Sequence, residues 1–227
     1  MVVDNILKKA IVLKDSMLQI TSGIDVTVEN SWSMLVCVGI HQGNNRLDSI
    51  LTLLNKNDLD SAEILTRSLF ELAVNLAYID KNVSERLPEY LRHGKVPMTK
   101  EEVEKLQQEL GNSSQLEAWR IVPKITWKTF KSMCIDLGLD WLDEYETFFR
   151  FVSIITHAGA FTLGENYKRL LEKQTPSDSE KAMFLLTALH FHLRIDEVAT
   201  RVFPSQIKIE VIKKMYAECN ELGNLLK

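Results

Sequence analysis

Apolar residues recur every three or four positions over long stretches of this chain, and that spacing limits the fold more than any other feature. In the first stretch they fall at Ile6, Leu7, Ala10, Leu13, Met17 and Ile20. A period of this kind places them on one face of an α-helix. Only nine glycines and five prolines occur among 227 residues, so few positions interrupt helices. The pattern predicts an all-α fold.

Helical periodicity continues along the rest of the chain and predicts a multi-helix bundle of about eight helices. Within the segment 31–56, Gly39 and the Gly43-Asn44-Asn45 cluster leave open whether one helix is continuous, kinked or split. We expect residues 1–227 to form a single helical domain, with a core at 31–202 on which the terminal helices pack. The helices are expected at about 4–20, 31–56, 58–79, 84–92, 100–110, 123–137, 141–161, 180–202 and 207–226, with an extended piece at 23–30.

Composition and charge exclude several classes of protein. The three cysteines are far apart and odd in number, which favours neither a disulfide framework nor a zinc site, and we expect no metal and no cofactor. The N-terminus lacks the continuous apolar core of a signal peptide, and the longest apolar run, 34–40, is too short to span a bilayer. We therefore expect a cytoplasmic protein without membrane contact. The formal net charge of −4 restricts any nucleic-acid contact to a local basic pocket.

Several common catalytic motifs are absent from the sequence. It contains no Gly-rich phosphate loop, no Gly-x-Ser-x-Gly and no His-Glu-x-x-His, and none of the five histidines follows a glutamate by three residues. Parallel-sheet nucleotide binding, serine hydrolysis and di-iron chemistry are therefore not expected.

A first polar stripe lies on the helix expected at 58–79. Arg67 and Glu71 are four residues apart, so both side chains point the same way, and Tyr78 lies seven residues further along that face. The surrounding residues are mostly Leu, Ala and Val. The stripe is either part of a partly buried functional site or an internal ion pair that fixes helix register.

A second polar stripe is expected on the helix at 141–161. Arg150, Ser153 and His157 are spaced three and four apart and share one face of an apolar helix. An imidazole can transfer a proton near neutral pH, and a guanidinium can hold a phosphate oxygen. These groups suffice to make an RNA 2′-hydroxyl attack its adjacent phosphate, with His157 as base or acid and Arg150 stabilising the charge. The alternative is a histidine packed in the core.

The two stripes together resemble a known sequence pattern. Arg-x3-Glu followed about eighty residues later by Arg-x2-Ser-x3-His is similar to an uncharacterised bacterial all-helical family known only as a domain of unknown function. The resemblance covers about residues 64–163. It implies that Arg67, Glu71, Ser153 and His157 are signature polar positions, and it brings no established activity.

The interval from Arg150 to His157 also resembles the Arg-x4-6-His element of the HEPN superfamily, the higher eukaryotes and prokaryotes nucleotide-binding domains. Many HEPN proteins are metal-independent ribonucleases or toxins of phage defence, in which two subunits bring their Arg-His pairs together. This resemblance implies catalytic roles for Arg150 and His157, a homodimer, and RNA or a nucleotide as ligand.

Two further features concern ligand contacts. Lys124, Lys128 and Lys131 form a basic stripe beside Trp127 and Phe130, which either holds a nucleic-acid strand or is a solvated face with the aromatics in the core. In the last long helices, His190 and His192 are two residues apart and therefore lie on different faces, so at most one is expected to face a pocket.

The sequence leaves two functions open. The first is a HEPN-like metal-independent endoribonuclease, or a nucleotide- or RNA-binding protein of a phage-defence or toxin system, with a protein partner or antitoxin. In it Arg150, His157 and Ser153 carry the chemistry and Arg67 and Glu71 orient them. The second is a non-catalytic helical interaction module in which the same Arg, Glu, Ser and His residues form a structural polar network.

Overall fold

In the computed structural model, residues 2–24, 30–93, 127–149 and 175–226 are described. Within these ranges the chain forms eight α-helices and one π-helical turn and no strand, which confirms the all-α prediction. The elements are α1 (Val2–Ser22), α2 (Ser31–Asn55), α3 (Leu59–Asp80), α4 (Val83–His93), α7 (Phe130–Leu137), α8 (Leu139–Glu144), η1 (Tyr145–Phe149), α11 (Asp178–Val202) and α12 (Ile209–Asn224).

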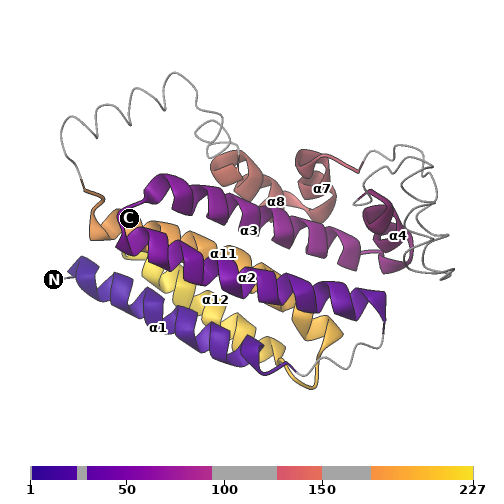
Figure 1. Cartoon of the computed structure of the whole chain (residues 1–227), viewed down its shortest axis with the longest axis horizontal. Helices are drawn as coiled ribbons and strands as arrows, with labels where there is room; N and C mark the ends of the chain where they lie inside the picture. The colour runs from indigo at the N-terminus through magenta and orange to yellow at the C-terminus, as the bar shows by residue number, and fades with distance from the viewer. Residues whose placement is uncertain (1, 25–29, 94–126, 150–174, 227) are drawn as a thin grey trace, which may run out of the picture.

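The long helices α1, α2, α3, α11 and α12 lie side by side in a bundle (Figure 1). Helix α11 is the central element, since it packs against each of the other four. Its buried residues include Leu185, Leu189, Phe191, Leu193 and Val198, and they point to several sides of the helix. A helix that is apolar over most of its circumference must be enclosed by neighbours. Side chains on different faces of α11 therefore meet different partners.

Helix starts are fixed by local side-chain hydrogen bonds. The Asn30 side chain accepts from the backbone N–H of Ser33 at 2.9 Å at the start of α2, and Asp58 accepts from that of Ser61 at 3.1 Å before α3. Ser177 and Glu180 form a reciprocal capping box at the start of α11. These residues satisfy backbone donors that the first turn of a helix leaves unpaired.

Helix α2 is continuous through both of its glycines, and close packing explains why glycine is there. A Cβ added at Gly39 would lie 2.6 Å from Leu76 Cδ1 of α3. A Cβ at Gly43 would lie 2.9 Å from His192 Cδ2 of α11. The two glycines let neighbouring helices approach α2 rather than breaking it, which settles the alternative that the sequence left open.

The short helices α7 and α8 cover the outer side of α3 (Figure 1). Lys81 Nζ donates to the carbonyl oxygens of Asp136, at 2.7 Å, and Leu137, at 3.2 Å, at the end of α7. A cation at this position is favoured by the helix dipole. Trp141 of α8 packs on Phe70, which in turn packs edge-on against Phe191 of α11 with ring centroids 4.9 Å apart. These contacts connect α8 to the middle of α11 through Phe70 of α3.

Two expected boundaries differ from the structure. The helix expected to start at 123 begins at Phe130, because the Thr129 side chain caps it by accepting from the N–H of Ser132 at 3.3 Å and residues 127–129 are not helical. The helix expected from 141 starts at Leu139 and changes to a π-helical turn at Tyr145. The expected helix at 100–110 lies outside the described residues.

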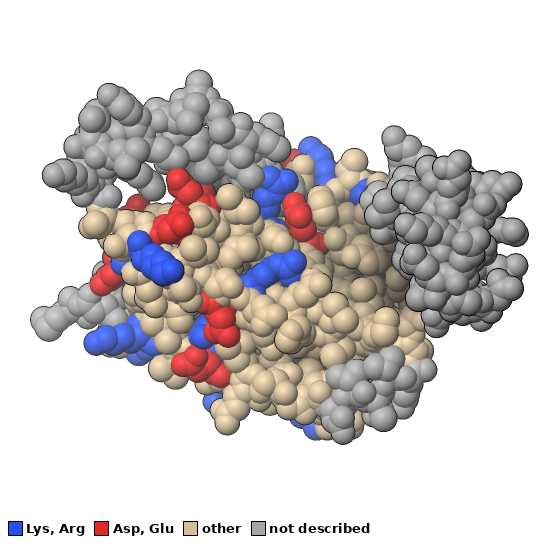
Figure 2. All heavy atoms as spheres, in the orientation of Figure 1, with Lys and Arg blue, Asp and Glu red and all other residues tan. Residues whose placement is uncertain are grey.

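The described surface shows no separation of charge by sign over the face in Figure 2, where basic and acidic side chains alternate. Within the described parts of the chain, no helix combines the length and the apolar character needed to cross a membrane.

Candidate functional site

The Arg67–Glu71 pair forms as its spacing predicts. Arg67 Nε donates to Glu71 Oε1 at 3.1 Å, and the two side chains are 20% and 32% exposed. Arg46 approaches from α2: burial lowers the pKa of its guanidinium, and the charge of Glu71 partly offsets that effect. Asn75 Nδ2 donates to the Glu71 carbonyl at 2.9 Å. The Glu71 carboxylate therefore pairs with Arg67 and exerts an electrostatic influence on Arg46 of α2.

Tyr78 belongs to a different group of side chains. Its ring is buried and packs edge-on against Trp127, with ring centroids 5.6 Å apart. The Arg86 guanidinium lies 3.8 Å from the centre of the Tyr78 ring. Tyr78 thus fixes the segment that precedes α7 rather than extending the Arg67–Glu71 face.

The predicted basic stripe is not a continuous helix face, because Lys128 precedes the start of α7. Lys128 pairs with Asp136 at 2.7 Å and Lys131 with Glu146 at 2.8 Å. Trp127 Nε1 donates to Asn75 Oδ1 of α3 at 2.9 Å, so this aromatic turns toward the bundle. Lys124 lies outside the described residues. The proposed contact of these lysines with nucleic acid stays a prediction.

Arg150, Ser153 and His157 lie outside the described residues. Their roles, and a contact between their stripe and the Arg67–Glu71 pair, stay predictions.

The structure brings together a polar cluster that the sequence reading did not single out. Glu144, at the end of α8, meets His190 and Arg194, which are one turn apart on α11. His190 Nε2 lies 2.8 Å from Glu144 Oε1, and Arg194 Nη2 donates to the same oxygen at 2.6 Å. We call Glu144, His190 and Arg194 the acid–base cluster.

Electrostatics fix the protonation pattern of this cluster. Burial alone would raise the pKa of Glu144, but the hydrogen bond from His190, the charge of Arg194 and its hydrogen bond outweigh it and lower that pKa. An ionised carboxylate only accepts, so the proton between Glu144 and His190 is on Nε2. Nδ1 of His190 is then the ring nitrogen that can take up a proton.

Arg194 is held between two aromatic rings. Its guanidinium carbon lies 4.8 Å from the centre of the Trp141 ring and 5.9 Å from that of Tyr216. Burial raises the pKa of Tyr216, so its phenol stays protonated and can donate a hydrogen bond. These contacts hold the Arg194 guanidinium in place and leave its Nε without a hydrogen-bond partner within the described structure.

Three buried polar atoms at this place have no hydrogen-bond partner within the described structure: Glu144 Oε2, Arg194 Nε and Tyr216 Oη. Each such atom costs about 1–3 kcal/mol relative to a paired one. Unpaired buried groups gathered in one place favour a site whose polar partners come from a ligand or from solvent.

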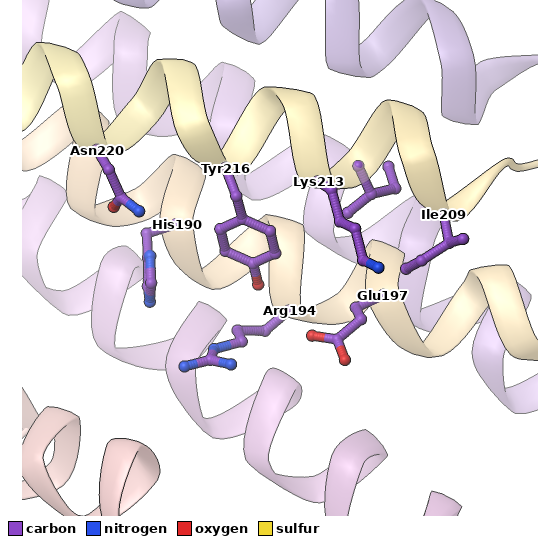
Figure 3. Close-up of a pocket in the computed structure, with 8 residues that line it drawn as sticks. His190, Arg194, Glu197, Ile209, Lys213, Tyr216 and Asn220 are labelled. Atoms are coloured by element: carbon purple, nitrogen blue, oxygen red, sulfur yellow. The ribbon is translucent and has the colours of Figure 1, made fainter.

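Two pockets adjoin the acid–base cluster. One, of about 340 Å³, lies between α11 and α12, and Figure 3 shows His190, Arg194 and Glu197 of α11 opposite Lys213, Tyr216 and Asn220 of α12. The second, of about 680 Å³, is lined by Glu144, Phe148 and His190 together with residues near the C-terminal end of α12. His190 and Asn220 line both pockets, so the imidazole lies where the two pockets meet.

His192 faces the other way, as the two-residue spacing predicts. It is fully buried, with Nδ1 3.0 Å from Asp196 Oδ2 and Nε2 2.8 Å from Asn44 Oδ1. Thr21 Oγ1 also contacts Asn44 Oδ1, at 3.1 Å. This buried network joins α1, α2 and α11, and it is structural.

Part of the acid–base cluster carries a signal in the sequence. His190 and Arg194 are four residues apart in an apolar helix, the same spacing that singled out Arg67 and Glu71. Glu144 offers no such signal, because it is 46 residues from His190 and meets it only through the packing of α8 on α11.

Comparison with known proteins places the chain in a family. A family model described as a family of unknown function, DUF5677, matches residues 41–174, which is more than half of the chain. Neither the curated proteins nor the solved structures gave a match. The matched segment contains Arg67, Glu71 and Glu144, whereas His190 and Arg194 follow it. The chain belongs to DUF5677, a family of unknown function, as its sequence pattern had indicated.

Proposed function

We propose that this protein binds RNA and cleaves it by metal-independent acid–base chemistry, with His190 as the proton-transferring group. The observation that carries the proposal is the imidazole of His190, oriented by an ionised Glu144 and placed beside Arg194 where two pockets meet. An oriented imidazole can transfer a proton, and a guanidinium next to it can stabilise the charge on a phosphate.

The cluster suits RNA better than substrates that need an enzyme nucleophile. Cys219 lines the larger pocket, but burial raises its pKa to about 12 and its Sγ donates to the Leu186 carbonyl. A protonated thiol is a weak nucleophile. RNA carries its own nucleophile in the 2′-hydroxyl, so only proton transfer and charge stabilisation are required of the protein.

The proposed reaction has two proton transfers and one displacement at phosphorus. Nδ1 of His190 takes the proton of the 2′-hydroxyl, and the 2′-oxygen forms a bond to the adjacent phosphorus. The bond from phosphorus to the 5′-oxygen breaks, and the proton returns from the imidazolium to that oxygen. The products are a 2′,3′-cyclic phosphate and a 5′-hydroxyl. Glu144 stabilises the imidazolium and Arg194 the charge on phosphate.

Arg150 and His157 are the second part of the proposal. The resemblance to HEPN proteins implies a catalytic role for these two residues alone, together with a homodimer and a defence or toxin system. In our proposal Ser153, Arg67 and Glu71 support them, and a protein partner holds the system in check. A catalytic role for Arg150 and His157 and a catalytic role for His190 predict different effects of substitution. One set of variants therefore distinguishes the two assignments.

The test is cleavage of a mixed, end-labelled RNA pool in EDTA by the wild type and by His190→Gln, His157→Ala and Arg150→Ala, with folding checked by circular dichroism. We expect wild-type products with cyclic phosphate ends and a loss of at least about 100-fold in His190→Gln. His41→Gln is the matched control, because His41 is exposed and bonded only to Asn45 within the described structure.

The variants that lose activity identify the residues that carry out the cleavage. Full activity in folded His190→Gln, with loss in His157→Ala and Arg150→Ala, would move the catalytic role to the sequence-predicted pair. An inactive wild type across varied RNAs would reject the ribonuclease.

The alternative is a non-catalytic interaction module, favoured by the Arg67–Glu71 pair and the His192 network, both of which join helices or turns without lining the two pockets. Under it, His190→Gln and His157→Ala change binding to a protein partner or stability, and there is no RNA cleavage to lose.

A further inference from the structure

The two pockets that meet at His190 differ in chemistry. The smaller one carries the charged groups: Arg194 and Glu197 from α11 and Lys213 from α12, with the Tyr216 hydroxyl between them (Figure 3). The larger one is mainly apolar. It is lined by Phe148, Met183, Leu186, Phe191, Cys219 and Leu226, with threonine and asparagine side chains in addition.

The charged pocket can accept an anion although Glu197 lines it and Glu144 lines the neighbouring pocket. Glu197 is paired with Arg201 at 3.1 Å, and Glu144 is shared by His190 and Arg194. Lys213 forms no ion pair with another described residue, whereas its neighbour Lys214 pairs with Glu218 at 3.9 Å. The exposed Lys213 ammonium therefore lines one pocket with Arg194 and Tyr216, whose Nε and Oη atoms are buried and have no hydrogen-bond partner within the described structure.

The apolar pocket offers aromatic surface next to that anion site. Phe148 is partly exposed at the pocket and packs edge-to-face on Phe191, with ring centroids 5.0 Å apart; Phe191 also lines the pocket but is only 2% exposed. Planar heterocycles bind to aromatic surface of this kind without strong sequence preference. Volumes of about 340 and 680 Å³ lie within the range of small-molecule sites, about 300–1,000 Å³.

We propose that the two pockets together hold one nucleotide, with the base in the apolar pocket, the phosphate at Lys213, Arg194 and Tyr216, and the ribose against His190. This inference rests on the proposed function for its choice of nucleotide over other aromatic phosphates. It assigns specificity to residues that the RNA-cleavage chemistry itself does not use: Lys213 for the phosphate and the α12 end at Gly223 for the base.

Two substitutions separate the pockets. Lys213→Met removes the ammonium and keeps the length of the side chain; Lys214→Met is its matched control, because Lys214 is exposed and lines neither pocket. Gly223 lines the apolar pocket, and a Cβ there meets no atom within 4 Å, so Gly223→Phe can fill the pocket without a backbone clash. Gly223→Ala occupies far less of it and should reduce binding less.

The experiment is calorimetric titration of the full chain with nucleoside monophosphates, the matching nucleosides and inorganic phosphate. For the monophosphates we expect Lys213→Met and Gly223→Phe each to weaken the Kd about tenfold or more, with Lys214→Met unchanged. Nucleoside binding should respond to Gly223→Phe alone and phosphate binding to Lys213→Met alone. Aryl phosphates without a ribose should bind more weakly than nucleotides.

Failure of this inference is distinguishable from failure of the proposed function. Nucleotide binding that neither Lys213→Met nor Gly223→Phe weakens would overturn the two-pocket assignment, even if RNA is cleaved. The expected binding pattern in a wild type that cleaves no RNA would uphold the nucleotide site and reject the chemistry at His190. Equal binding of nucleotides and simple aryl phosphates would overturn the choice of nucleotide.

Discussion

His190 and His192 lie two residues apart on α11, and each has a carboxylate partner, yet their surroundings are opposite. His190 contacts Glu144 from another helix, 26% of its side chain is exposed, and it lines two pockets. His192 contacts Asp196 one turn along its own helix and has no exposed surface. The identity of a histidine and its acidic partner therefore does not decide its role. The two histidines differ in their access to these pockets.

The further contacts of the two histidine–carboxylate pairs also differ. Glu144 also binds Arg194, which places a cation beside the imidazole. His192 instead uses its other ring nitrogen to contact Asn44 of α2, so its bonding connects helices. We infer that His192 stabilises the fold and that His190 is free to act on a ligand, and the following predictions test this contrast.

Replacing His192 is expected to have the largest effect on the stability of the protein. His192→Ala leaves the buried Asp196 without its partner and opens a cavity between α2 and α11, so we expect a loss of about 3 kcal/mol in the free energy of unfolding. Urea denaturation followed by circular dichroism measures it. His190→Ala should cost less than about 1 kcal/mol, since its side chain is partly exposed. Equal losses of unfolding free energy in His192→Ala and His190→Ala would contradict the inferred difference between the two histidines.

Gly43→Ala should disturb the same network more mildly. The added Cβ would lie 2.9 Å from His192 Cδ2 and 3.4 Å from Ile195 Cδ1. Overpacking then exceeds the gain in helix propensity, with a net loss of about 1 kcal/mol. Gly223→Ala is the control, because its Cβ meets nothing within 4 Å and its helix should be unchanged or slightly more stable. A stabilising Gly43→Ala would mean that His192 can move away freely.

The acid–base cluster should make stability depend on pH. The pKa of Glu144 is lowered in the folded protein, so its contribution is present above the ordinary glutamate range and is lost as pH falls through the folded value. We expect wild type to be more stable than Glu144→Gln at neutral pH, with the difference shrinking on acidification. Chemical denaturation at a series of pH values tests this. If the stability difference between the two proteins did not change with pH, the contacts with His190 and Arg194 would not lower the pKa of Glu144.

The smallest effect is expected at the Arg67–Glu71 pair. Both side chains are partly exposed and four apart on α3, so Glu71→Gln should cost about 0.5 kcal/mol in thermal or urea unfolding. A loss above about 2 kcal/mol would show that this pair is part of a buried network, as the interaction-module alternative requires.

Much of the fold follows from the sequence because its causes are local. Apolar spacing gives α1, α3, α11 and α12 to within a few residues. Asp58 caps the start of α3, and Gly138 follows the end of α7. Gly138 has φ 124° and ψ 179°, so it is not the left-handed helical cap that a glycine in this position predicts. The start of α7 was missed because Thr129 caps it within an otherwise helical-looking segment. The role of Gly39 and Gly43 depends on neighbours from α3 and α11, which no local pattern contains.

The candidate site was only partly predictable for the same reason. The spacing of Arg67 and Glu71 gave a true pair, and the spacing of His190 and His192 correctly separated their faces. Glu144 and Tyr216 join His190 and Arg194 only through the packing of α8 and α12 on α11, over distances in sequence that periodicity does not report.

The most direct test of the central claim is a paired measurement on His190→Gln and His192→Gln: free energy of unfolding, and rate of RNA cleavage in EDTA. We predict that His190→Gln unfolds within about 1 kcal/mol of wild type and loses at least about 100-fold in cleavage, whereas His192→Gln loses stability first and retains cleavage where it remains folded. Wild-type cleavage by a fully folded His190→Gln would contradict the account.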